Sequence, residues 1–179
     1  IFTMKSEDIS RRSFLKRAAA LSAAAAIPSF WIPSKANAMP GVPFVSANEK
    51  VRIAFIGIGN RGGEIAQELY KTGLCEVVAL CDVDMGAPHT QKLISMFPKV
   101  PRFQDFRQMF DKMADKIDAV TVGVPDHAHF PITIEAMAHG KHVYVEKPMA
   151  RTFQEIEVMM RAEKKFGVVT QMGNQGHSE

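Results

Sequence analysis

Short apolar runs alternate with segments of helical spacing from about residue 50 onward. The run 51–56 is almost continuously apolar, and the segment 62–71 then places Ile65, Ala66 and Leu69 on one helical face. A continuous apolar run predicts a strand that is buried on both faces, because a half-exposed strand would alternate apolar with polar residues. The two segments together predict a buried strand followed by a helix that packs on it.

The same alternation continues to the end of the chain. Further strands are predicted over 77–81, near Phe103, and over 117–122, 142–145 and 168–172; further helices are predicted over 88–96, 106–113, 131–139 and 152–166. Gly140 and Gly167 are natural C-caps, and Thr152 with Glu155 has the spacing of a capping box. Regular alternation of strand and helix predicts an α/β fold with a doubly wound parallel sheet, here a dinucleotide-binding domain over 50–179.

The first 38 residues have the organisation of an export signal. The segment 10–16 reads S-R-R-S-F-L-K, which resembles the twin-arginine motif, and an Ala-rich stretch over 18–27 follows it. That stretch is about ten residues long, whereas a bilayer span needs about twenty. Ala36, Asn37 and Ala38 have the small-x-small form of a cleavage site.

We therefore expect a twin-arginine signal peptide over 1–38 and a linker that contains Pro and Gly over 39–49. The twin-arginine translocase would carry the folded protein to the periplasm or the exterior, without a stable membrane anchor. An amphipathic helix that lies on a membrane or a partner is the alternative interpretation of the leader.

The net charge of +3 is concentrated in this leader. Residues 1–38 hold six Lys and Arg residues and two acidic residues, which leaves 16 basic and 17 acidic residues of the totals of 22 and 19. The remainder has no basic excess of the kind that attracts nucleic acid or a membrane surface. We therefore expect no nucleic-acid partner.

The two cysteines, Cys75 and Cys81, lie along one predicted strand. Six residues of strand span roughly 20 Å, whereas a disulfide needs Cα atoms within about 7 Å. The two thiols therefore cannot pair with each other, and we interpret both residues as small apolar core residues.

Gly57-Ile58-Gly59-Asn60-Arg61-Gly62 matches G-x-G-x-x-G between a predicted strand and a predicted helix, the context that gives this motif its meaning. Gly57 would permit the tight turn, Gly59 would let the backbone approach a pyrophosphate, and Gly62 would allow close packing of helix on strand. The loop, with Asn60 and Arg61, is therefore predicted to bind a dinucleotide at the helix N-terminus.

Asp82 ends the second predicted strand, 20 residues after Gly62. A carboxylate at this place accepts hydrogen bonds from the adenosine ribose hydroxyls, and its charge would repel a 2′-phosphate. The residues that follow, Val83 to Gly86, include no Lys or Arg. The sequence therefore favours NAD over NADP, which stays the alternative.

Two further segments follow predicted strands: V-P-D-H-A-H over 124–129 and E-K-P over 146–148. Both lie at carboxyl ends of strands, where open α/β sheets bind ligands. With the glycine loop, these segments resemble the Gfo/Idh/MocA family of oxidoreductases over residues 50–179. The E-K-P segment is the most specific mark of the resemblance, and some members of the family are exported by the twin-arginine route.

The resemblance implies a role for each of these residues. Lys147 would be catalytic: it would lie beside the nicotinamide ribose, orient the substrate hydroxyl and help to relay its proton. Glu146 and Pro148 would set the shape of the loop, Pro148 through a cis peptide bond. Pro125 and its neighbours, with His129 among them, would line the nicotinamide side of the cofactor.

The histidines have simpler interpretations as well. His127 and His129 are more simply explained as surface or helix-cap residues, and no third ligand accompanies them, so we expect no metal site. His89, His139 and His142 are interpreted as structural.

The family resemblance predicts an enzyme that moves a hydride between a nicotinamide cofactor and a sugar or polyol carbon, as a homo-oligomer. An NAD-dependent glycosidase of the same superfamily and a non-catalytic dinucleotide-binding protein are the alternatives. The exported glycosidases depart from E-K-P, so Lys147 favours the oxidoreductase. In the family, the substrate domain and a catalytic Asp/His pair follow the dinucleotide domain, and we expect them after Glu179.

Overall fold

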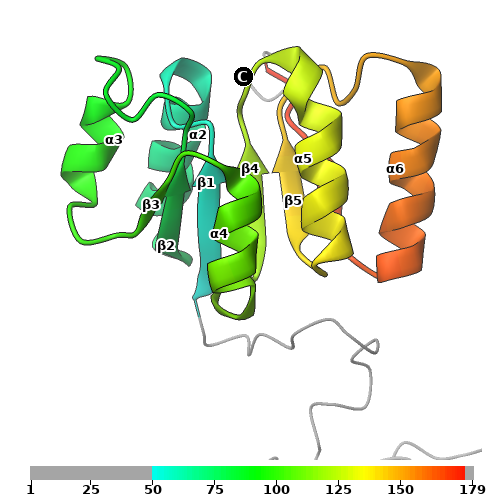
Figure 1. Cartoon of the computed structure of the whole chain (residues 1–179), viewed down its shortest axis with the longest axis horizontal. Coiled ribbons are helices and arrows are strands. Elements are labelled where there is room, and N and C mark those ends of the chain that lie inside the picture. Colours follow the sequence, from blue (N-terminus) through cyan, green and yellow to red (C-terminus); the bar gives the residue numbers. More distant parts are fainter. Residues whose placement is uncertain (1–49, 176–179) are drawn as a thin grey trace, which may run out of the picture. The chain divides into compact units, whose positions relative to one another are not determined.

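The computed structural model describes residues 50–175, which form an open six-stranded parallel sheet with helices packed on it (Figure 1). In chain order the elements are β1 (Val51–Ile56), α2 (Asn60–Lys71), β2 (Cys75–Cys81), α3 (Gln91–Met96), β3 (Arg102–Phe103), α4 (Phe106–Met113), the 3₁₀ turn η2 (Ala114–Lys116), β4 (Ala119–Val122), α5 (Asp126–Ala138), β5 (His142–Val145), α6 (Phe153–Phe166) and β6 (Thr170–Met172). The strand order is β3-β2-β1-β4-β5-β6, and every pairing is parallel. The predicted doubly wound α/β fold is confirmed.

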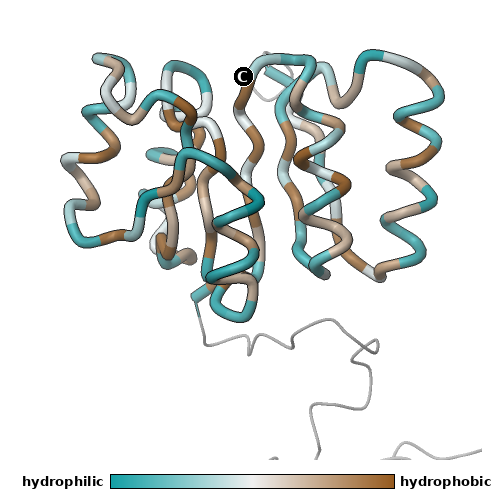
Figure 2. Tube along the Cα trace, viewed as in Figure 1, coloured by the Kyte–Doolittle hydropathy of each residue, from teal (hydrophilic) through white to brown (hydrophobic). Residues whose placement is uncertain are grey.

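Hydrophobic cores cover both faces of the sheet. In β1, Ile53 and Phe55 pack with residues of α2 and α3, whereas Ala54 and Ile56 pack with residues of α4, α5 and α6. Figure 2 shows the resulting pattern, with hydrophobic residues along the strands and mixed character around the helices. From Ile53 to Ile56 the strand is apolar because both of its faces are buried, as the sequence predicted.

The glycine caps occur where the sequence places them. Gly140 follows the end of α5 with φ 69°, and Gly167 caps α6 with φ 64°. The Thr152 hydroxyl accepts a hydrogen bond from the Glu155 amide at 3.2 Å, as an N-cap should. In a capping box the Glu155 carboxylate would accept from the amide of the N-cap residue, Thr152. Here it accepts instead from the amide of Arg151, one residue earlier, at 2.8 Å.

The start of α5 differs from the prediction. The helix begins at Asp126, five residues before Pro131, which lies inside it. The predicted helix over 131–139 begins at this proline, a residue type that is favoured at the first helical position and disfavoured inside a helix. Here the exposed Pro131 lacks only one amide, and Asp126 in the first turn interacts favourably with the helix dipole.

Both cysteines are buried within β2 with free thiols, which confirms their interpretation as core residues. Burial raises the pKa of Cys81 to about 12, so its thiol is protonated at neutral pH. Within residues 50–175, no helix is long and apolar enough to cross a bilayer. The expected signal peptide and linker, residues 1–49, lie outside the described part of the chain.

An ion pair between the half-buried Arg52 and the buried Asp118 joins β1 to the residue that precedes β4. Asp118 is 3% exposed and accepts from the Arg52 amide at 2.8 Å and from the Arg52 Nη2 at 2.6 Å. Burial raises the pKa of Asp118, but the hydrogen bonds and charge of Arg52 outweigh it and hold the pKa below the usual value of an aspartate. A carboxyl whose pKa is lowered by folding stabilises the fold above its unfolded pKa, and this contribution is lost as the pH falls through the folded pKa.

We therefore expect the free energy of unfolding to fall more steeply below pH 4 in the native protein than in an Asp118→Asn variant. At pH 7 the variant should be less stable by about 1–3 kcal/mol, since one charge-assisted hydrogen-bond partner is removed. Urea unfolding followed by circular dichroism at pH 7 and pH 3 measures both quantities. Equal pH dependence in the two proteins would contradict this role for Asp118.

Candidate functional site

The glycine loop joins β1 to α2, and its glycines lie close to neighbouring groups. Gly57 has φ 79°, which favours glycine, and its amide donates to the carbonyl of Cys81 at 2.8 Å. A Cβ on Gly62 would lie 2.1 Å from the Gly57 carbonyl oxygen, inside the van der Waals distance. The turn at Gly57 and the close helix–strand approach at Gly62 are therefore present as predicted.

Gly123 is a third glycine at this contact, and the sequence analysis did not identify it. It follows β4, and a Cβ on it would lie 2.6 Å from the Cα of Gly62. The missed signal was a glycine directly after the strand that pairs with β1. Three backbones thus meet where only glycine fits.

The N-terminus of α2 is open to a ligand. Its N-cap is Gly59, no side chain caps it, and its first turn contains no acidic residue. Asn60 begins the helix with φ 43°, a left-handed conformation that asparagine tolerates better than most residues. Amides at a helix N-terminus carry partial positive charge and bind phosphate groups.

Asp82 lies directly after β2 and is tied to the glycine loop. One carboxylate oxygen accepts from the Ile58 amide at 2.9 Å, and the other accepts from the Asp84 amide at 3.0 Å. A carboxylate offers about four lone-pair positions, so two remain for ribose hydroxyls. The bond between Asp82 and the Ile58 amide fixes the position of the glycine loop relative to the end of β2.

A cavity of about 660 Å³ extends along the carboxyl ends of β1, β2 and β4. The predicted cofactor-binding residues that line it are Gly57, Gly59, Asn60, Arg61, Asp82 and Pro125. His89, expected to be structural, also lines this cavity and packs against Gly59: a Cβ on Gly59 would lie 2.0 Å from the imidazole carbon Cδ2. His89 shows no signal in the sequence because it approaches the glycine loop from the distant β2–α3 connection.

The remaining predicted residues, namely Gly62, His129, Glu146, Lys147 and Pro148, lie outside the lining of this cavity. His129 is 1% exposed, and its Nδ1 lies 2.6 Å from the carbonyl oxygen of Pro148. His127 is exposed and lines the cavity, so the two histidines face different surroundings. Within residues 50–175, no three metal-ligating side chains gather at one point.

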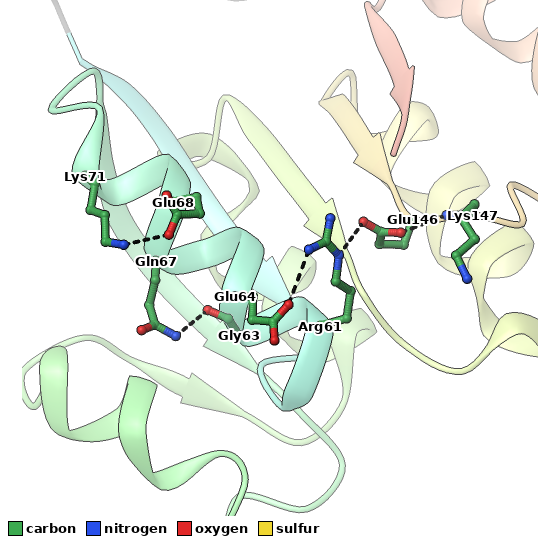
Figure 3. Close-up of polar contacts among 8 residues, drawn as sticks. All are labelled: Arg61, Gly63, Glu64, Gln67, Glu68, Lys71, Glu146 and Lys147. Atoms are coloured by element: carbon green, nitrogen blue, oxygen red, sulfur yellow. Dashed lines mark hydrogen bonds and ion pairs between the residues drawn. The ribbon is translucent and has the colours of Figure 1, made fainter. Parts of the chain in front are cut away.

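The E-K-P segment follows β5 and bonds across to the first turn of α2 (Figure 3). Glu146 is buried and accepts from the Nε of Arg61 at 3.2 Å, whereas Lys147 is exposed. The Lys147–Pro148 peptide bond is cis, as the resemblance implied. Lys147 therefore directly follows Glu146, whose side chain is bonded to Arg61 in the lining of the cavity.

The residues present fit a dinucleotide. The glycine loop has the glycines that close approach requires, no side chain caps the N-terminus of α2, and Asp82 lines the cavity with acceptor capacity left. The strand order places the cavity at the carboxyl ends of β1 and β4, where the order of strands along the chain reverses. Open α/β sheets bind ligands at this switch point.

Comparison with known proteins agrees with this geometry. Residues 51–174 match the Gfo/Idh/MocA family, described as an oxidoreductase family with an NAD-binding Rossmann fold. The chain belongs to this family. Its described part is therefore an NAD-binding domain.

Relatives within the family have different activities. An α-N-acetylgalactosaminidase from Shewanella oneidensis is 30% identical over 83% of this chain and 35% of its own length. Myo-inositol 2-dehydrogenase from Lactobacillus plantarum is 26% identical with a TM-score of 0.62, over 70% of this chain and 36% of that chain.

A dehydrogenase from Thermus thermophilus, solved in complex with NAD and α-ketoglutarate, has a TM-score of 0.64 at 20% identity, over 72% of this chain and 43% of that chain. Its likeness shows the shared fold. The chain spans little more than a third of the length of the curated relatives it matches.

Proposed function

We propose that the complete protein is an NAD-dependent oxidoreductase that acts on a hydroxyl-bearing carbon of a sugar or polyol. The dinucleotide supplies C4 of its nicotinamide as the hydride acceptor or donor. In the oxidative direction, the substrate carbon loses a hydride, the hydroxyl loses a proton, and a carbonyl forms. The glycine loop and Asp82 hold the cofactor, and Lys147 orients the hydroxyl and takes part in moving its proton.

The single observation that carries this proposal is the position and exposure of Lys147. It follows β5 at the same sheet edge as the cavity, and its exposed ammonium is available to a substrate. An ammonium donates hydrogen bonds and can hold a hydroxyl in one orientation. The test is to incubate the complete protein with NAD and a panel of sugars and polyols, and to follow absorbance of the reduced nicotinamide together with the carbonyl product.

A second candidate function is glycoside cleavage through transient oxidation of the sugar. The observation that favours it is the similarity to glycosyl hydrolase family 109 proteins, which are 30% identical over 83% of this chain. The two functions leave different products. A glycosidase releases aglycone from an aryl glycoside with no net change in NAD, whereas a dehydrogenase accumulates one equivalent of NADH per carbonyl formed.

Asp82 should determine the choice between NAD and NADP. We expect the protein to prefer NAD and Asp82→Ala to lower that preference by about tenfold, since it removes a negative charge near a 2′-phosphate and with it roughly 1.4 kcal/mol of repulsion. Fluorescence titration with both reduced cofactors measures the two dissociation constants. A native preference for NADP would refute this assignment of Asp82.

We also propose that the protein is exported by the twin-arginine route to the periplasm or beyond. The S-R-R-S-F-L-K segment, the Ala-rich stretch and the Ala36-Asn37-Ala38 site support this in their order along the chain. Replacing Arg11 and Arg12 with Lys should retain the precursor in the cytoplasm. Cell fractionation and immunoblotting measure the distribution, and unchanged export of the double variant would contradict the assignment.

A further inference from the structure

Glu146 is a buried carboxylate at the edge of the candidate site. Its side chain is 5% exposed, and it accepts two hydrogen bonds: from Nε of Arg61 at 3.2 Å and from the backbone amide of Lys147 at 3.2 Å (Figure 3). The first bond joins residues that are 85 positions apart. The second acts on the backbone of the lysine itself.

The surroundings leave this carboxylate little freedom. A Cβ on Gly173 would lie 2.7 Å from Glu146 Oε1 and 2.7 Å from the hydroxyl of Tyr144, so Oε1 of Glu146 and the Tyr144 hydroxyl both pack against Gly173. Gly173 is in turn fixed by its amide, which donates to the carbonyl of Val145 at 2.7 Å. The carboxylate is thus enclosed on one side by β5 and the chain after β6, and on the other side by Arg61.

Burial makes the carboxylate depend on its cation. A buried charge that loses its partner is strongly unfavourable, whereas an exposed pair contributes little. Arg61 has one partner of each kind, because Glu64 is 65% exposed and lies 3.3 Å from Nη1. The bond to Glu146 is therefore the one with structural consequence.

The other end of the lysine loop is held as well. The carbonyl oxygen of Pro148 can only accept, so the Nδ1 of His129, 2.6 Å away, donates to it. His129 is buried in the first turns of α5, a rigid element. The backbone is therefore held on both sides of the Lys147 side chain. The Lys147 amide is bonded to Glu146, which is bonded to Arg61 of α2, and the Pro148 carbonyl is bonded to His129 of α5.

We propose that Arg61 is a positioning residue for Lys147: through Glu146 it transmits the position of the phosphate-binding helix to the lysine loop. This rests on the proposed role of Lys147 in hydride transfer. The side chain of Arg61 would otherwise be interpreted as a phosphate ligand, since it lines the dinucleotide cavity. The two roles predict different kinetics.

The experiment compares Arg61→Met, Glu146→Gln and the double variant in the complete protein. The matched control is Glu64→Gln, which removes the exposed partner of Arg61 and leaves Glu146 paired. We expect Arg61→Met to slow the hydride step on the order of tenfold or more, because small displacements of a positioned group are costly to rate. The dissociation constant of NAD should change less than about threefold, while Glu64→Gln matches the native protein.

The double variant tests the connection through Glu146. If Arg61 acts through that carboxylate, Arg61→Met should have little further effect once Glu146→Gln is present. Independent losses that multiply would overturn the proposal. A weakened NAD affinity with an unchanged hydride step would also overturn it, and would assign Arg61 to the phosphates.

A second measurement does not depend on turnover. Hydrogen–deuterium exchange of the segment that holds Lys147 should be faster on the order of tenfold in Arg61→Met than in the native protein, since the loop loses one anchor. Unchanged exchange would contradict the positioning role. A native protein that transfers no hydride to any sugar or polyol, with exchange still faster in Arg61→Met, would refute the proposed function and leave the anchoring of the loop intact.

Discussion

Alanine at Gly62 should eliminate useful dinucleotide binding. The added Cβ would lie 2.1 Å from the carbonyl oxygen of Gly57 and 2.9 Å from that of Gly123, and both are backbone atoms that cannot rotate away. The start of α2 must therefore move off the sheet, which carries its amides away from the phosphates. We expect the dissociation constant of NAD to rise by about 100-fold or more, as if roughly 2.7 kcal/mol of binding were lost.

The free energy of unfolding should also fall, by about 1–3 kcal/mol, which is the usual range for overpacking. Isothermal titration with NAD and urea unfolding of the same preparation separate the two effects. A folded Gly62→Ala protein that binds NAD with native affinity would show that the close contact is not needed for the site.

Gly73→Ala is the matched control. Gly73 has φ 71°, so alanine is strained there, but a Cβ on it would meet no atom within 4 Å. We expect a stability loss of about 1–2 kcal/mol from the left-handed conformation and an unchanged dissociation constant for NAD. The comparison distinguishes a glycine that is required by its backbone angle from one that is required by a contact.

Local patterns predicted most of the fold. Continuous apolar strands, glycine caps and the G-x-G-x-x-G spacing depend on residues close together in sequence, and the structure has β1, α4 and β5 with the predicted bounds. The predicted start of α5 was wrong because the residues next to a proline look the same whether the proline begins a helix or lies inside one. Local rules cannot separate the two cases, since the difference lies in the turn that precedes the proline.

The connections of the site were not predictable in this way. The bond between Arg61 and Glu146, the contact of Gly123 with Gly62, and the bond from His129 to Pro148 all join segments that are brought together by the order of strands. No spacing rule relates such residues. Sequence patterns therefore identify candidate site residues, whereas the contacts between these residues depend on the order of strands in the sheet.

Lys147→Met should lower turnover of the complete enzyme far more than it lowers cofactor affinity. Methionine keeps much of the length of the side chain and removes the ammonium, so it deletes the hydrogen-bond donor without opening a large gap. A positioned acid–base group is worth a factor of about 10² to 10⁴ in rate, and we expect a loss in that range. This loss should exceed that of Arg61→Met, which displaces the ammonium without removing it.

Dinucleotide affinity should change only a few-fold, because we propose that the glycine loop and Asp82 hold most of the cofactor, and Lys147 lies outside the cavity lining. Lys164→Met, on the exposed last turn of α6, is the control for loss of a lysine charge. Single-turnover measurements at saturating NAD isolate the hydride step, and titration gives the dissociation constant. If Lys147→Met retained its rate at saturating NAD and lost affinity, Lys147 would be a cofactor ligand, and proton transfer would depend on residues of another domain.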